Sequence, residues 1–246
     1  MENKQRIDIY LVNNQYCTTR TKAQELIKNG MVFVNNIKVE KTNLLIDKNQ
    51  EIKINDFKFV SRGGYKLEHA INTFGVDFNN KVVLDIGSST GGFVDCALQY
   101  GAKFVFALDV GSNQLDNKLK NNPKICSLEN TNLKSINKEM FSKKIDIITC
   151  DVSFISLKHV FCAISEIVSE ETIMIFLIKP QFDLSKEILD KTKGKITFDK
   201  HHQLAINNVL NDAKSFHFSL MTMTESPIKG KKMCNTEYLG LFKWKK

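Results

Sequence analysis

The sequence predicts an α/β protein in two unequal parts, a small α+β unit followed by a larger unit built on a Rossmann-like, mainly parallel sheet. Short apolar runs alternate with helical patterns through the second part, which is typical of a doubly wound sheet. A glycine-rich turn follows the apolar run Val82–Ile86, as expected where a buried strand meets a ligand site. The length of 246 residues leaves room for one domain of ordinary core size and a smaller one.

Residues 1–60 predict the small unit. Apolar side chains recur at helical spacing over residues 7–11, and a second helix is expected from the cap Thr18-Thr19 to the stop signal Asn29-Gly30. A hairpin is expected at residues 32–39, because the central pair Asn35-Asn36 tolerates the positive φ angles of a two-residue turn. Further short strands are expected at residues 44–46 and 51–54.

Arginine is confined to this end of the chain. Among 35 basic residues the only arginines are Arg6, Arg20 and Arg62, and a guanidinium group offers phosphates a planar, two-point contact that lysine lacks. Arg20, Gln24 and Lys28 are spaced four residues apart on the second helix and therefore share one face. The net charge of +8 favours an anionic partner such as nucleic acid, although a lysine-rich composition and a solvated helix face are alternative explanations.

This part of the chain resembles the S4 RNA-binding domain. The resemblance rests on Arg6-Ile-Asp8, Thr19-Arg-Thr-Lys-Ala23, Ile27-Lys-Asn-Gly30 and Val32-Phe-Val-Asn35. It implies two helices and a hairpin that grip structured RNA. The residues expected to contact RNA are Arg6, Arg20, Lys22, Lys28 and Arg62.

The second part begins after a glycine-containing segment. Ser61-Arg-Gly-Gly-Tyr-Lys66 predicts a flexible linker, so the expected domains are residues 1–60 and 67–246, with residues 61–66 between them. Buried strands are expected at residues 82–86, 104–109, 125–128, 145–150, 172–178, 218–223 and 238–242. Only a turn containing Pro227 and Gly230 separates the last two strands, which should therefore pair antiparallel.

The glycine-rich turn indicates a nucleotide-like cofactor. Gly87-Ser-Ser-Thr-Gly91-Gly92 fits neither the dinucleotide spacing nor a phosphate loop, which leaves an adenosyl group without a pyrophosphate. Asp85 ends the strand before the turn, where a carboxylate can face the ammonium of a methionine moiety. Asp109 ends the next strand, where a carboxylate commonly holds ribose hydroxyls. Together these features predict S-adenosyl-L-methionine, with a glycine turn in another kind of α/β protein as the alternative.

Two further strand ends carry charged residues. Asp151 follows the expected strand at 145–150, and Lys179 follows the strongly apolar run Ile173–Ile178. Because the ligands of open α/β sheets bind beyond the carboxyl ends of the strands, both are candidate site residues. The alternatives are an aspartate that caps the next helix and a lysine that extends to solvent.

Taken in order, motifs over nearly the whole chain resemble the TlyA family. They are Ser61-Arg-Gly-Gly-Tyr-Lys66, Asp85-Ile-Gly-Ser-Ser-Thr-Gly-Gly-Phe93, Asp109-Val-Gly111, Asp151-Val-Ser-Phe-Ile-Ser156, Lys179-Pro-Gln-Phe182 and Ser226-Pro-Ile-Lys-Gly230. The resemblance implies an S4 domain joined to an FtsJ-like (RrmJ-like) class I S-adenosylmethionine-dependent methyltransferase with a seven-stranded sheet. Members are described as haemolysins and as ribosomal RNA cytidine 2′-O-methyltransferases.

The same resemblance implies the site residues. The family's catalytic Lys-Asp-Lys-Glu tetrad falls on Lys66, Asp151, Lys179 and Glu237. Its cofactor pocket falls on Asp85, Gly87, Ser89, Gly91, Gly92, Phe93, Asp109, Glu129 and Asp151. The sequence departs from the family pattern at Asn130, where arginine is usual, at Lys193-Gly-Lys-Ile196 and at Cys234.

These residue types suit methyl transfer to a ribose hydroxyl. A positive charge on Lys66 disfavours a second one on Lys179, so Lys179 can act as the base, while Asp151 and Glu237 orient the ammonium groups. No metal is required. The six scattered cysteines contain no metal-binding pair, and we expect them to be free thiols that are mostly buried.

The expected partner is ribosomal RNA or a ribosomal subunit. Short family members with little sequence before the S4 domain tend to modify the large-subunit RNA, which favours 23S over 16S ribosomal RNA. A ribosome-assembly factor without methyl transfer and a membrane-active haemolysin are the competing hypotheses, although no long apolar run supports a pore former. The chain starts without a secretion signal, so a cytoplasmic protein is expected. We also expect it to be monomeric when free.

Overall fold

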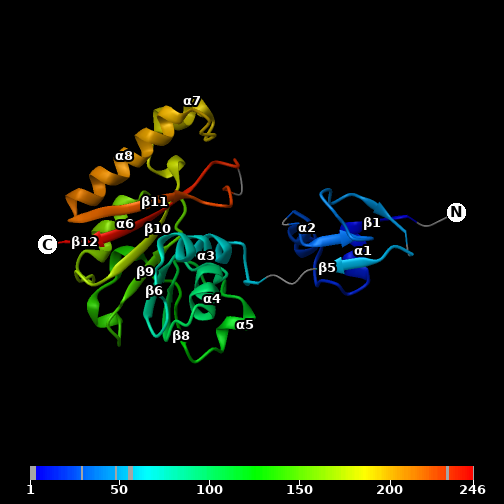
Figure 1. Ribbon diagram of the computed structural model, residues 1–246, viewed down its shortest axis with the longest axis horizontal. Helices are drawn as coiled ribbons and strands as arrows, with labels where there is room; N and C mark the ends of the chain where they lie inside the picture. The colour runs from blue at the N-terminus through cyan, green and yellow to red at the C-terminus, as the bar shows by residue number, and fades with distance from the viewer. Residues whose placement is uncertain (1–3, 29, 48, 55–57, 231–232, 246) are drawn as a thin grey trace. The chain divides into compact units, whose positions relative to one another are not determined.

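The computed structural model describes residues 4–28, 30–47, 49–54, 58–230 and 233–245 (Figure 1). The chain divides into two compact units, Met1–Lys58 and Phe59–Lys246, called here the small unit and the large unit. Each has its own hydrophobic core, one in the small unit and one on each face of the large unit's sheet. Separate cores in the two units agree with the predicted division into a small and a large part.

The small unit contains the predicted helices and hairpin. Its helices are α1 (Ile7–Asn13) and α2 (Arg20–Lys28), and its strands are β1 (Gln5–Arg6), β2 (Val32–Val34), β3 (Ile37–Lys38), β4 (Leu45–Ile46) and β5 (Ile52–Ile54). Strand β2 pairs antiparallel with both β3 and β5, and β1 pairs with β4. Asn35 and Asn36 have φ angles of 49° and 64°, which confirms the two-residue turn. The Thr19 hydroxyl accepts a hydrogen bond from the backbone N–H of Lys22 and so caps α2, as predicted.

The core of the small unit explains the spacing of its apolar residues. Ile7 and Leu11 of α1 pack with Ala23 and Ile27 of α2, and Val32 of β2 completes the cluster. All five side chains are almost completely buried. The opposite face of α2 is thereby left to its polar residues.

The large unit is built on a seven-stranded sheet in the order β11-β12-β10-β9-β6-β7-β8. Its strands are β6 (Val82–Ile86), β7 (Phe104–Leu108), β8 (Ile125–Leu128), β9 (Ile147–Cys150), β10 (Ile173–Ile178), β11 (Phe218–Glu225) and β12 (Tyr238–Trp244). Strands β6 to β10 run parallel, whereas β12 is antiparallel to both β10 and β11. The predicted parallel sheet with an antiparallel final pair is confirmed.

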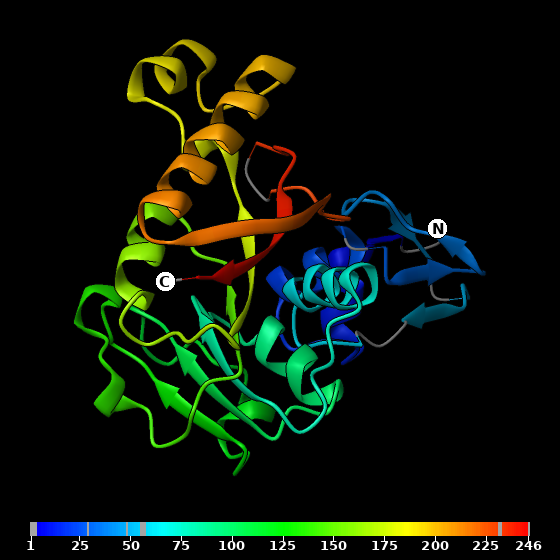
Figure 2. The ribbon, with the colours of Figure 1, turned by 60° about the vertical axis from the view of Figure 1, so that its left-hand side comes forward.

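Helices cover both faces of this sheet (Figures 1 and 2). One face packs against α3 (Gly63–Phe74), α4 (Gly92–Gln99) and α5 (Asn117–Lys120), and the other against α6 (Leu157–Ile164) and α8 (Asp199–Ser215). The remaining elements are α7 (Lys186–Thr192) and the 3₁₀ turns η1 (Leu133–Ser135), η2 (Lys138–Met140) and η3 (Pro180–Phe182). Burial on both faces favours strands that are largely apolar, which is why the strands read as near-continuous apolar runs.

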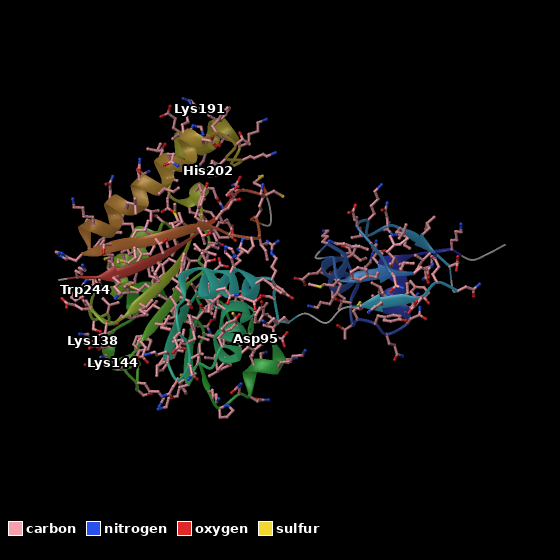
Figure 3. The ribbon with its side chains drawn as sticks, in the orientation of Figure 1. Asp95, Lys138, Lys144, Lys191, His202 and Trp244 are labelled. Carbon is pink, nitrogen blue, oxygen red and sulfur yellow. The ribbon has the colours of Figure 1, made fainter. Side chains whose placement is uncertain are left out.

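The topology brings the candidate site residues to one edge of the sheet. Parallel strands end at the same edge, so the segments after β6, β7, β9 and β10 lie together there. Because β12 is antiparallel, its first residue, Tyr238, pairs with Ile178 at the end of β10. The two ends of β12 can be located in Figure 3. His202, whose ring contacts Tyr238 at the start of the strand, lies well apart from Trp244 at its end.

The segment 61–66 is not the flexible linker that the sequence predicted. The boundary between the units falls after Lys58, and α3 already begins at Gly63. Phe59 is only 1% exposed. The backbone N–H of Val60 donates to the carboxylate of Asp95 on α4, which is labelled in Figure 3. Residues 59–60, directly before the segment, are therefore fixed to the large unit by an apolar anchor and a hydrogen bond, and its residues 63–66 belong to α3.

The glycines in this segment serve close packing rather than flexibility. A Cβ on Gly64 would lie 2.3 Å from Cγ of the buried Phe59 ring. A Cβ on Gly92, the first residue of α4, would lie 3.0 Å from the backbone nitrogen of Gly64. The prediction failed because sequence spacing does not distinguish a glycine that permits motion from one that permits contact.

Replacing Gly64 with alanine should therefore destabilise the large unit. The added methyl group must displace Phe59 near its backbone, and overpacking of this kind costs about 1–3 kcal/mol. Gly63→Ala is the matched control, because its Cβ would meet no atom closer than 3.5 Å. Chemical denaturation of both variants measures the difference. Equal loss of stability in the two would show that Phe59 moves aside without cost.

The cysteines differ in part from the expectation. All six are free, as predicted, but only Cys96 and Cys150 are buried, whereas Cys162 and Cys234 are exposed. Cys162 lies on the face of α6 opposite its buried residues Val160, Phe161 and Ile164, so its exposure follows from the helix period.

Within the described residues, no helix combines the length and apolar character needed to span a membrane.

Candidate active site

The predicted tetrad forms one chain of alternating charges. Nζ of Lys66 lies 2.6 Å from Oε2 of Glu237 and 3.7 Å from Oδ2 of Asp151. Nζ of Lys179 lies 2.6 Å from Oδ1 of the same aspartate. These residues come from α3, from the ends of β9 and β10 and from the loop before β12, so the fold brings together groups that are far apart in the sequence.

The tetrad is largely withdrawn from water. Lys66, Lys179 and Glu237 are 5%, 7% and 2% exposed, whereas the side chain of Asp151 is 23% exposed. Burial alone would raise the pKa of Asp151, but the charges of Lys66 and Lys179 outweigh it and hold that pKa below its usual value. Asp151 is therefore an anion at neutral pH, and it lies where the tetrad meets solvent.

Ser153 is a member of the site that sequence reasoning did not assign. The ammonium of Lys179 donates a 2.8 Å hydrogen bond to its hydroxyl, in addition to its bond with Asp151. Two acceptors from the segment after β9 thus hold the lysine nitrogen. The available signal was position, because Ser153 stands two residues after a candidate acid at a strand end.

Phe154 is also exposed at this edge. Its side chain is 76% exposed, and its φ angle of 69° is uncommon for an aromatic residue. Its ring centroid lies 5.4 Å from that of Phe182, whose ring is 6.0 Å from Nζ of Lys179. An exposed aromatic ring beside a polar site offers a surface on which a nucleobase can stack.

Asp183 connects the two segments that carry Asp151 and Lys179. Its carboxylate accepts a 3.1 Å hydrogen bond from the backbone N–H of Leu157, at the start of α6. Burial raises the pKa of Asp183 to about 6, although hydrogen bonds from Ser156 and Leu157 oppose this shift. The sequence analysis missed this residue, because an aspartate in a loop carries no sign of its distant partner.

The glycine-rich turn requires its glycines, but partly for a reason other than the expected approach of a ligand. Gly87 and Gly91 have φ angles of 81° and 89°. A Cβ would lie 3.0 Å from the Asp151 carbonyl oxygen at Gly87, and 2.4 Å from the Leu119 side chain at Gly91. Both glycines are therefore required by the fold itself, whether or not a ligand is bound.

Two carboxylates organise the loops around this turn. Asp109 accepts hydrogen bonds of 2.7 Å from the backbone N–H groups of Ser89 and Gly111. Glu129, which follows β8, accepts a 2.7 Å bond from the backbone N–H of Asn113. The predicted cofactor residues after β6, β7 and β8 thus lie in one connected set of loops at the carboxyl edge of the sheet.

Asp85 is a buried acid with an unused acceptor. It is 1% exposed, and its Oδ1 accepts a 2.7 Å hydrogen bond from the Thr149 hydroxyl. Within the described residues its Oδ2 has no hydrogen-bond partner. Burial raises its pKa to about 7, with Thr149 opposing the shift and the charges of Asp151 and Asp109 adding to it. A buried, unpaired carboxylate oxygen suits a cationic ligand group.

Comparison with known families identifies this arrangement. The family model described as FtsJ-like methyltransferase matches residues 59–243, which is most of the chain. The chain belongs to the FtsJ-like methyltransferase family. The model described as S4 domain matches residues 5–52. The large unit is therefore the methyltransferase domain and the small unit is the S4 domain.

Relatives extend this similarity over both domains and confirm the resemblance to the TlyA family. The chain is 43% identical over 239 residues to Hemolysin A of Brachyspira hyodysenteriae, covering 96% of this chain and 99% of that one. It is 35% identical to the 23S rRNA (cytidine-2'-O)-methyltransferase TlyA of Campylobacter jejuni, with 93% and 96% covered. A solved structure from Streptococcus thermophilus, titled as a candidate hemolysin, superposes with a TM-score of 0.77 at 32% identity, with 99% and 90% covered.

Two predicted cofactor residues of the methyltransferase domain face its core. The Phe93 side chain is 4% exposed and belongs to the cluster that packs α3 and α4 on the sheet. Gly92 is also buried, and the space around its Cα is filled by Ser61 and Gly64. Only the backbone of these two residues remains for a ligand.

Of the predicted RNA-binding residues of the S4 domain, Arg6 ends β1 directly before α1, and Arg20, Lys22 and Lys28 lie on α2. Arg6 and Arg20 both bind the carboxylate of Asp8. Lys22 lies 3.7 Å from Glu25 on the same helix, and Lys28 is exposed. Arg20 and Lys28 lie on the polar face of α2, away from Ala23 and Ile27 in the core.

Arg62 has a different place from the other predicted RNA-binding residues. It precedes α3 in the methyltransferase domain rather than belonging to the S4 domain. Its charge also contributes to the lowered pKa of Asp151. Arg62 therefore belongs to the methyltransferase domain and contributes positive charge near the tetrad.

Proposed function

We propose that this protein transfers a methyl group from S-adenosyl-L-methionine to the ribose 2′-hydroxyl of a cytidine in ribosomal RNA. The 23S molecule is the main substrate, and 16S is a second candidate. The observation that carries the proposal is the buried chain Glu237–Lys66–Asp151–Lys179 at the carboxyl edge of the sheet. The similarity to the Campylobacter jejuni TlyA enzyme supports the choice of reaction and substrate.

The cofactor residues are those around the glycine-rich turn. The buried Oδ2 of Asp85, which has no hydrogen-bond partner among the described residues, is a suitable acceptor for the ammonium of a methionine moiety. Asp109 and Glu129 would hold the ribose and adenine parts, and the backbone of residues 87–93 would line the pocket. When bound, the cofactor supplies an electrophilic methyl group on a sulfonium.

The tetrad acts on the hydroxyl that receives the methyl group. Lys179, held between Asp151 and Ser153, acts as a neutral amine after one ammonium proton has left to solvent; it takes up the hydroxyl proton as the oxygen forms its bond to the methyl group, and Asp151 stabilises the ammonium that results. Lys66 holds Asp151 from its other side and is itself held by Glu237. Because all four groups are fixed before the substrate arrives, much of the rate enhancement comes from positioning.

RNA is held by both domains. Arg6, Arg20, Lys22 and Lys28 of the S4 domain supply phosphate contacts that set the register on a structured RNA. In the methyltransferase domain, Arg62 lies near the tetrad, and the exposed ring of Phe154 supplies a stacking surface for the base of the target nucleotide. A protein that methylates ribosomal RNA in this way would act in the cytoplasm.

The test is to incubate the purified protein with labelled cofactor and with 50S subunits, 30S subunits or free ribosomal RNA. Label should enter 23S RNA, and nucleoside analysis should find it in 2′-O-methylcytidine. The modified ribose should also resist alkaline cleavage, because its 2′-oxygen is blocked. Label in a base with the ribose unmodified would refute the reaction class. RNA binding without any transfer would instead favour the assembly-factor hypothesis.

Cofactor affinity should depend on pH through Asp85. Its pKa of about 7 in the ligand-free protein means that the carboxyl must lose a proton before it can pair with an ammonium. Below about pH 7, affinity should therefore fall by up to tenfold per pH unit. The stability of the ligand-free protein should depend on pH in the opposite direction. Because the pKa of Asp85 is raised in the folded state, its protonation stabilises the fold at low pH, and this contribution is lost as pH rises through about 7.

Calorimetric titration of the cofactor between about pH 5.5 and 7 measures this dependence. Asp85→Asn should bind more weakly at pH 7 and should lose most of the pH dependence, since its amide does not titrate. An affinity of the parent protein that is constant over this range would place the ammonium away from Asp85.

A further inference from the structure

One buried carboxylate joins the arginines of the S4 domain. The side chain of Asp8 has no exposed surface. Nε and Nη2 of Arg6 each donate to it at 3.0 Å, one to each carboxylate oxygen. Nε of Arg20 and Nε2 of Gln24 both donate to its Oδ2 at 2.9 Å. Side chains from the start of α1 and from the polar face of α2 thus converge on a single acceptor.

This cluster keeps a net positive charge at its surface. The hydrogen bond from Arg6 holds the pKa of Asp8 far below its usual value; burial opposes this, and Gln24 and Arg20 reinforce it. Asp8 is therefore an anion at any pH of interest, and two guanidinium groups outweigh its charge. The side chains of Arg6 and Arg20 are 39% and 53% exposed, so the positive groups face solvent above a buried negative one.

Both arginines keep donors for a ligand. The described hydrogen bonds of Arg20 use only its Nε, and those of Arg6 use Nε and Nη2. A guanidinium carries five N–H donors in a rigid plane, so terminal N–H groups of each remain directed away from Asp8. Planar pairs of N–H groups match the oxygens of a phosphate, which an ammonium can bind only as a point charge.

We propose that Asp8 is a positioning residue for RNA recognition, which holds Arg6 and Arg20 as a fixed pair for the phosphate backbone of ribosomal RNA. The inference rests on the proposed function, because it requires ribosomal RNA as the ligand. A long basic side chain normally loses rotational freedom when it binds a phosphate, and that loss weakens binding. Arginines already held by Asp8, which Gln24 also contacts, lose less rotational freedom.

The proposal and simple charge attraction predict opposite effects for Asp8→Asn. Removing a negative charge from a basic surface should strengthen RNA binding if only net charge matters. If Asp8 positions the arginines, the same change should weaken binding by about tenfold, which is the effect expected for loss of a well-made arginine contact. The measurement is the affinity for a 23S ribosomal RNA fragment over a series of salt concentrations, with the full-length protein and no cofactor.

Glu25→Gln is the matched control. It makes the same charge change on α2, at a partly exposed residue whose ionic partner is Lys22 at 3.7 Å. It should bind RNA as tightly as the parent or slightly more tightly. Arg20→Lys is the second variant, because it keeps the charge and removes the planar group; it should weaken binding about fivefold.

Thermal unfolding of each variant shows whether the S4 domain is folded at the assay temperature. If Asp8→Asn is unfolded there, Arg20→Lys decides the question. Tighter binding by Asp8→Asn, or parental affinity and salt dependence of Arg20→Lys, would overturn the positioning role. A parent protein that does not bind ribosomal RNA at all would overturn the proposed function, and with it this inference.

Discussion

Lys179→Ala should lose about 10³-fold in the rate of methyl transfer while binding cofactor and ribosomal RNA nearly as the parent does. The lysine nitrogen is fixed by Asp151 and Ser153 at the carboxyl edge of the sheet, where the proposed reaction needs a proton acceptor. Its loss removes an interaction with the reacting hydroxyl rather than a contact made equally by bound substrate. Single-turnover kinetics, with separate measurements of cofactor and RNA affinity, distinguish these effects.

The control for this variant is Lys158→Ala. Lys158 lies on α6, its side chain is 57% exposed, and it pairs with Asp212 rather than with a member of the tetrad. It should retain parental turnover. Appreciable turnover by Lys179→Ala would remove Lys179 from the mechanism, and a matching loss in both variants would indicate a general effect of lost positive charge on RNA binding.

Glu237→Gln should destabilise the methyltransferase domain by about 3 kcal/mol and also abolish most of its activity. Glu237 and Lys66 are almost fully buried and lie 2.6 Å apart. Without the glutamate charge, the only carboxylate described near the Lys66 ammonium is that of Asp151, at 3.7 Å. A buried cation that loses its closest partner is costly, because the solvation given up on folding is no longer replaced.

The double variant Lys66→Met with Glu237→Leu separates stability from catalysis. Replacing both charges by apolar groups removes the unpaired cation, so most of the lost stability should return, whereas methyl transfer should not. Chemical denaturation and the methyl transfer assay are measured on the same preparations. If the double variant is no more stable than Glu237→Gln, the two charges are not energetically coupled. If it is active, the tetrad does not carry the reaction.

The sequence was sufficient for the elements and for their order. The strands β6 to β10 are largely apolar because both faces of the sheet are covered, and such runs can be recognised without knowing what covers them. The turn at Asn35 and Asn36 and the threonine cap of α2 were predictable because they depend on local backbone conformation. Residues at the strand ends, Asp85, Asp151 and Lys179, follow from the same reasoning.

Some residues of the candidate active site were predicted from their positions at strand ends, and others only from the family resemblance. Glu237 has no local feature that marks it, since it becomes a site residue only because β12 is antiparallel and starts at the carboxyl end of β10. Ser153 was missed because its role is a contact with Lys179 and not a motif. Asp183 was missed for the same reason, as its partner Leu157 lies on another segment.

The sequence by itself determined the two-domain α/β architecture, the glycine-rich turn and the charged residue types at the strand ends, because these depend on periodicity and local conformation. The tertiary structure alone decided which charges meet. It placed Glu237 against Lys66 and gathered Arg6, Arg20 and Gln24 around Asp8. It also showed that the segment 61–66 is packed rather than flexible. Such contacts join residues distant in sequence, and their energies depend on distance and burial, which no local pattern contains.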